Sequence, residues 1–189
     1  MNESDDMTLR WGGTQAQMKN KVHVAIAAGL LTTVVVGCGP HDEPTKGRRL
    51  EEQALESATY KPFHHSEWVT LKRGAYSQGY ETVNLEGARG YGDLNADGVE
   101  DVAVVLVSSG GGSGSFKEIV AVLNHGGVPA HVASADLGDR VKVEAIAVES
   151  GTIRVQLIVH DEDDPMCCPT KRVTWEYRLQ EGKLVKMQP

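Results

Sequence analysis

The chain has 189 residues and a formal net charge of −7, with 24% charged and 40% hydrophobic residues. This balance is typical of a globular protein rather than a disordered one, and the length allows one ordinary domain with appendages. An acidic chain lacks the clustered Lys and Arg side chains that bind nucleic-acid phosphates or anionic lipids. We therefore expect no nucleic-acid partner, and no membrane contact that depends on surface charge.

The N-terminal region has the features of a bacterial export signal. Residues 1–17 are polar and precede a second methionine, so we interpret them as an over-long gene start. Residues 18–37 begin with Lys19 and Lys21 and continue as an apolar run, which is shorter than the roughly 20 residues of a spanning helix. The sequence Val35-Val36-Gly37-Cys38 resembles the lipobox of bacterial lipoproteins. The resemblance implies lipid on Cys38 and a membrane as partner through that anchor; an uncleaved anchor helix or a buried core helix is the alternative.

Residues 38–58 are polar and charged, and the piece 47–58 is helix-prone, so we expect a tether with one short helix before a folded domain at 59–189. From about residue 60 the pattern is that of β-strands, predicted at 69–71, 80–85, 102–107, 116–123, 128–133, 141–148, 153–159, 173–179 and 183–187. The continuous apolar run at 102–107 suits a central strand covered on both faces. Glycine turns between the strands predict a hairpin at 124–127 and, overall, a mostly β, single antiparallel sandwich or barrel-like domain.

The sequence Gly92-Asp93-Leu94-Asn95-Ala96-Asp97-Gly98-Val99-Glu100-Asp101 is the sharpest motif in the chain. Asp93, Asn95, Asp97 and Asp101 provide side-chain oxygens at alternating positions, and Val99 would add its carbonyl. This spacing predicts a calcium site with a structural role, and Glu100 is expected to point outward. The residue at the twelfth position is Val104 rather than the glutamate of an EF-hand, so the loop resembles those of integrin-like and FG-GAP repeats. A metal-free turn held by its own side chains is the alternative.

The second motif is Asp164-Pro165-Met166-Cys167-Cys168-Pro169-Thr170. With Cys38 lipidated, two adjacent cysteines remain in an oxidising compartment. Adjacent Cα atoms are about 3.8 Å apart, below the usual disulfide range, so a disulfide between them would close a strained ring. Four interpretations remain open: a disulfide that clips a turn, a structural pair of thiols, a soft-metal site with Met166, and a redox switch.

Other segments give weaker signals. The glycine-rich stretch 108–115 lacks the lysine that ends a phosphate-binding loop, and His64-His65 has no further ligand at a useful spacing. No catalytic motif is recognised, so we do not expect an enzyme.

Several stretches together carry a family resemblance: residues 69–76, 91–105, 112–116, 137–141 and the Cys167-Cys168 motif. They are similar to the LppP/LprE-type bacterial lipoproteins, which have no established biochemical role. The resemblance covers residues 54–187 and supports the lipoprotein interpretation. From the anchor, the tether and the absence of a catalytic grouping, we expect an envelope protein that binds another envelope protein, peptidoglycan or a glycan. A periplasmic soft-metal or thiol-redox protein using Met166, Cys167 and Cys168 is the second hypothesis.

Overall fold

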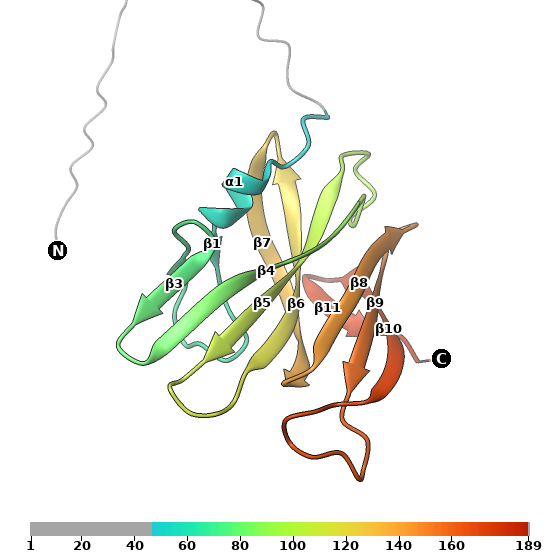
Figure 1. Ribbon diagram of the computed structural model, residues 1–189. Coiled ribbons are helices and arrows are strands. Elements are labelled where there is room, and N and C mark those ends of the chain that lie inside the picture. The colour runs from blue at the N-terminus through green and yellow to red at the C-terminus, as the bar shows by residue number, and fades with distance from the viewer. Residues whose placement is uncertain (1–46, 189) are drawn as a thin grey trace, which may run out of the picture. The chain divides into compact units, whose positions relative to one another are not determined.

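The computed structural model describes residues 47–188, which form a mostly β domain (Figure 1). Its one helix among these residues is α1 (Glu52–Glu56). The strands are β1 (Thr59–Tyr60), β2 (Val69–Thr70), β3 (Ala75–Gln78), β4 (Glu81–Gly92), β5 (Asp101–Ser109), β6 (Phe116–His125), β7 (Val128–Asp139), β8 (Lys142–Glu149), β9 (Thr152–Val159), β10 (Lys171–Gln180) and β11 (Lys183–Lys186).

The strands form two antiparallel sheets that pack as a sandwich, which confirms the first of the two predicted architectures. The larger sheet has the order β3-β4-β5-β6-β7 and the smaller one β11-β10-β9-β8, and a two-stranded β1-β2 ladder lies beside them. Neighbours in sequence are neighbours in each sheet, because a turn or a loop joins each strand to the next antiparallel one. The turns predicted around Gly127, Gly151 and Gly182 are present, and all three glycines have positive φ.

The predicted central strand is confirmed in β5, whose side chains alternate between two hydrophobic cores. Val102, Val104 and Leu106 face one core, and Ala103 and Val105 face the other. All five are fully buried. The second core lies between the two sheets, so the larger sheet is covered on both faces, as a continuous apolar strand requires.

Two glycines in β4 allow the smaller sheet to approach closely. A Cβ atom added to Gly90 would lie 2.6 Å from Ile146 Cγ2, and one added to Gly92 would lie 2.7 Å from Val148 Cγ1. Both neighbours belong to β8. A larger residue at either position would push β8 away from β4, because real Cβ atoms do not tolerate such distances.

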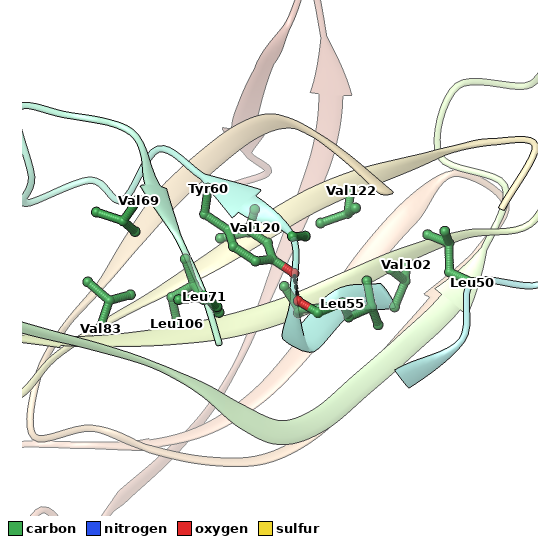
Figure 2. Close-up of a cluster of buried hydrophobic side chains, with 12 residues drawn as sticks. Leu50, Leu55, Tyr60, Val69, Leu71, Val83, Val102, Leu106, Val120 and Val122 are labelled. Carbon is green, nitrogen blue, oxygen red and sulfur yellow. Dashed lines mark hydrogen bonds between the residues drawn. The ribbon is translucent and has the colours of Figure 1, made fainter. Parts of the chain in front are cut away.

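The first core, on the opposite face of the larger sheet, is closed by the segment that precedes β1 (Figure 2). Leu50 is 2% exposed, and Leu55 on α1 is fully buried. The buried Tyr60 donates its hydroxyl hydrogen to the carbonyl oxygen of Leu55 at 2.9 Å. The packed domain therefore begins near residue 50 rather than at 59, and the helix is five residues long. Residues 50–58 are part of the fold, because their two leucines complete this core.

The predicted export signal, Cys38 and the first part of the tether lie outside the described residues. Between residues 47 and 188 no helix is long and apolar enough to span a membrane.

Candidate functional site

The acidic loop joins β4 to β5, and its polar side chains turn back toward its own backbone. Asp93 Oδ1 accepts the N–H groups of Asn95 (3.3 Å) and Asp97 (3.2 Å), while its Oδ2 accepts that of Gly98 (2.9 Å). Asn95 Oδ1 accepts the Asp97 N–H at 3.1 Å, and Asp97 Oδ1 accepts the Val99 N–H at 2.7 Å. Gly98 has φ +82°, which allows the sharp turn expected at this position. The alternating spacing therefore produces a curled loop with its side-chain oxygens on the inside.

Asp101 begins β5 and anchors the loop to the rest of the domain. Its carboxylate is fully buried, and its two oxygens accept the backbone N–H groups of Leu94 and Asn124, each at 2.9 Å. The Asn124 side chain extends this network by donating to the carbonyl oxygens of Arg48 (2.7 Å) and Glu100 (3.0 Å). Asp101 and Asn124 together thus link the acidic loop, the end of β6 and the N-terminal segment.

Burial is the largest influence on Asp101 and raises the pKa of its carboxyl group. The two backbone N–H groups oppose this effect, and the negative charges of Asp97 and Asp93 reinforce it. The loop therefore concentrates like charges next to a buried carboxylate, and a bound cation would relieve their repulsion.

The five residues expected to hold calcium do not play equivalent roles. Asp93 and Val99 are partly exposed, and Asn95 and Asp97 are exposed, whereas Asp101 is fully buried. In residues 47–188, no three His, Cys, Asp or Glu side chains form a group arranged to hold a metal ion. The remaining donors, two carboxylates, one amide and one carbonyl, are all oxygen donors, which suit a hard cation such as calcium. Asp101 holds the loop in position through its hydrogen bonds to the Leu94 and Asn124 N–H groups.

The acidic loop also borders the smaller sheet. A hollow of about 450 Å³ is lined by residues 93–96 of the loop, by Ser150 and Gly151 of the β8–β9 turn, and by Leu179. Glu100 points outward, as expected, and pairs with Arg49 at 2.9 Å. An ion held by the loop would therefore lie where the two sheets meet.

The second candidate site is the loop between β9 and β10. The sulfur atoms of Cys167 and Cys168 lie at disulfide distance, and both residues are exposed, as is Met166. Asp164 organises the loop by accepting the N–H groups of Asp161 (2.8 Å) and Thr170 (2.7 Å) and the hydroxyl hydrogen of Thr170 (2.8 Å). These bonds lower the pKa of the Asp164 carboxyl group, the Asp161 N–H having the largest effect. The pair thus lies on an accessible loop with its own polar frame.

The weaker sequence signals have structural explanations. His64 Nε2 lies 3.3 Å from Asp136 Oδ1, and His65 Nδ1 lies 3.8 Å from Glu81 Oε2, so the two histidines have different partners. The glycine-rich loop after β5 is held through Ser115, whose N–H donates to Asp139 Oδ1 at 2.7 Å.

Sequence reasoning missed three polar residues of the fold: Asn124, Glu118 and His131. The sequence pattern places Asn124 in a turn, where an Asn side chain often accepts a backbone hydrogen bond, here from the Gly127 N–H. Glu118 interrupts the apolar pattern of β6 yet is 1% exposed. A charged residue between apolar strand positions was the only signal of its burial.

No family model, curated protein or solved structure matches this chain.

Proposed function

We propose that this chain is a lipid-anchored protein of the bacterial cell envelope, whose β-sandwich is a calcium-stabilised binding or structural module. The observation that carries the calcium proposal is the curled acidic loop fixed by the buried carboxylate of Asp101. Its accessible oxygens come from Asp93, Asn95, Asp97 and Val99. Calcium would offset the repulsion among three carboxylates and tie the loop to the two strands that it joins.

The calcium proposal is tested by thermal unfolding of the full chain in millimolar calcium and in excess chelator. At ten times the dissociation constant, a ligand stabilises the native state by about 1.4 kcal/mol, which raises Tm by roughly 3–5 °C in a chain of this size. Asp97→Asn should remove this rise, since it removes one charged donor. Glu100→Gln is the matched control on the same loop, because Glu100 points outward and should leave the rise intact. Equal Tm values for the unchanged protein in both buffers would refute the proposal.

The anchor proposal rests on Val35-Val36-Gly37-Cys38 and the apolar run before it. Two acyl chains hold a protein on a bilayer far more firmly than one. Mass spectrometry of the membrane-extracted protein should find a mature N-terminus at Cys38 carrying acyl groups. Cys38→Ala should leave the precursor uncleaved. A mature protein of unmodified mass in the soluble fraction would contradict the anchor.

A domain held at a membrane by lipid is placed to bind another envelope protein, peptidoglycan or a glycan. Exposed aromatic side chains of the described region would supply contacts, among them Trp68 (58% exposed) and Tyr80 (86% exposed). Co-sedimentation with purified peptidoglycan tests one of these partners directly. Trp68→Ala and Tyr80→Ala should weaken that binding if these rings form the contact.

A second candidate function is supported by the β9–β10 loop, where Met166, Cys167 and Cys168 are exposed together. Reduced, these three sulfur atoms would suit a soft ion such as Cu(I), and a reversible disulfide would suit a thiol-redox role. Free-thiol counting with copper titration of the reduced chain distinguishes this candidate. Cysteines that remain oxidised under envelope-like conditions, in a protein that takes up no copper, would exclude it.

A further inference from the structure

Residues 61–68, here called the strap, connect β1 to β2 and lie against β6 and β7. Two backbone N–H groups of the strap donate to side chains that can titrate. The Phe63 N–H donates to Glu118 Oε2 at 2.8 Å, and the Lys61 N–H makes a longer bond of 3.5 Å to His131 Nδ1. The strap is therefore held to the sheet mainly by the shorter bond to the Glu118 carboxyl group.

Glu118 occupies an unusual position for an acidic residue. It is 1% exposed, and its second oxygen, Oε1, has no hydrogen-bond partner among residues 47–188. On the neighbouring strand, the buried hydroxyl oxygen of Ser108 also lacks a partner within the same region. Glu118 pairs with Leu106 and Ser108 pairs with Phe116, so Glu118 and Ser108 lie diagonally on one face of the sheet. An ionised carboxylate in this place is costly, because its charge is buried and only its Oε2 accepts a backbone N–H group.

The charged groups that face Glu118 do not neutralise it. His64 approaches from the strap and Asp136 from β7, and these two pair with each other at 3.3 Å. The Ser134 hydroxyl group is a hydrogen-bond partner of the carboxyl group and, like His64, lowers its pKa, while the β5 neighbours Leu106 and Ser108 do not titrate. Burial is the main influence and raises the pKa of Glu118 to about 7, against the opposing effect of the Phe63 N–H.

We propose that the strap is a pH-dependent cover for the first hydrophobic core, which is closed while Glu118 is protonated and opens more often when Glu118 ionises. In the closed state the carboxyl group is buried beneath the strap. Lifting the strap admits water to the carboxylate, which removes the cost of burying its charge. The same movement uncovers the part of the sheet around Glu118, whose cross-strand partner Leu106 belongs to that core. This inference is independent of calcium and of the lipid anchor.

The direction follows from the two protonation states. The closed state holds its proton up to about pH 7, whereas a hydrated Glu118 in the open state loses it near pH 4.5. The equilibrium constant for opening therefore increases as pH rises from 4.5 to about 7, and it stays constant at higher pH. A shift of this size allows the opening constant to rise by up to roughly 300-fold across the window, and by up to roughly 70-fold between pH 5 and pH 8.

Hydrogen exchange of the Phe63 amide in the full chain tests the proposal. After correction for intrinsic exchange at each pH, its protection should fall by up to roughly 70-fold from pH 5 to pH 8. The Leu71 amide is the control, since it donates to the Ala58 carbonyl at 3.0 Å and involves no titrating group. Its corrected protection should not change. Glu118→Gln keeps an acceptor for the Phe63 amide but cannot ionise, so its Phe63 protection should be the same at both pH values.

Two further measurements keep the test decisive if Glu118→Gln does not fold. A carboxyl titration of the unchanged protein by NMR should place Glu118 near 7, and Asp136→Asn should lower that midpoint, because the Asp136 charge raises the Glu118 pKa. Corrected Phe63 protection that is constant with pH would overturn the proposal. So would an ordinary titration midpoint for Glu118, or an equal fall in protection at Leu71, which would indicate opening of the whole domain.

Discussion

Leu55→Ala tests whether the segment before β1 belongs to the fold or is only a tether. Leu55 is fully buried on α1 and packs in the core with Leu50 and Tyr60. Truncating a buried leucine to alanine removes its transfer free energy and leaves a cavity, together costing about 2–5 kcal/mol. Full burial in contact with several large side chains places the expected loss at about 3–4 kcal/mol. The slightly higher helix propensity of alanine offsets only a few tenths of a kcal/mol.

Urea unfolding of the full chain at neutral pH measures this loss. With a slope of about 1.5–2 kcal/mol/M, the midpoint should fall by roughly 2 M. Gln53→Ala is the matched control, because Gln53 is exposed on the same helix and should change stability by less than about 0.5 kcal/mol. A loss below 1 kcal/mol for Leu55→Ala would show that α1 does not pack on the sheet. The domain would then begin near residue 59 after all.

Three other changes test the remaining polar features. Asp101→Asn places an amide NH₂ opposite one of the two backbone N–H groups and also removes a buried charge, which offsets part of the loss. The unfolding free energy in urea should fall by about 1–2 kcal/mol, whereas Asp163→Asn, at an exposed position, should leave it unchanged. Burial lowers the pKa of His131 to about 4, so the unfolded chain binds a proton there that the folded chain does not bind between pH 6.5 and about 4. The unfolding free energy therefore falls as pH decreases over this range, and His131→Gln should remove that fall in acid unfolding curves. Replacing both Cys167 and Cys168 by serine should change the unfolding free energy by less than about 0.5 kcal/mol, because Asp164 holds this loop; a larger loss would show that the pair clips the fold.

Glu118 and His131 affect stability in opposite directions over part of the acid range. Between pH 4.5 and 6.5 the Glu118 contribution falls with rising pH while the His131 contribution increases, so the two nearly cancel. The free energy of global unfolding, in which both groups become hydrated, is therefore nearly constant between pH 4.5 and 6.5. Changing either residue alone should expose the slope of the other.

Periodicity predicted the sheet well, because burial on two faces leaves a clear pattern. The continuous run from Val102 to Val107 identified β5, and the turns with Gly127 and Gly151 placed two hairpins correctly. The strand ends were less predictable. β4 extends to Gly92 through a register shift after Leu85, since a bulge interrupts the alternation that marks a strand.

The sequence predicted the shape of the acidic loop but not the hydrogen bonds that fix it to the rest of the domain. The spacing of Asp93, Asn95 and Asp97 predicted a curled loop, yet the separate role of Asp101 depends on Asn124, which lies far away in sequence. The burial of Leu50 and Leu55 in the first core also depends on residues that are distant in sequence. Leu50 and Leu55 are isolated among charged residues, and only the sheet face opposite them shows why they are buried.

Calorimetric titration of the full chain with calcium measures directly whether the acidic loop binds this ion. We expect one calcium per chain, with a dissociation constant of about 10⁻⁴–10⁻³ M, and no binding by Asp97→Asn. No calcium binding at millimolar concentration, or equal binding by the unchanged protein and Asp97→Asn, would contradict it.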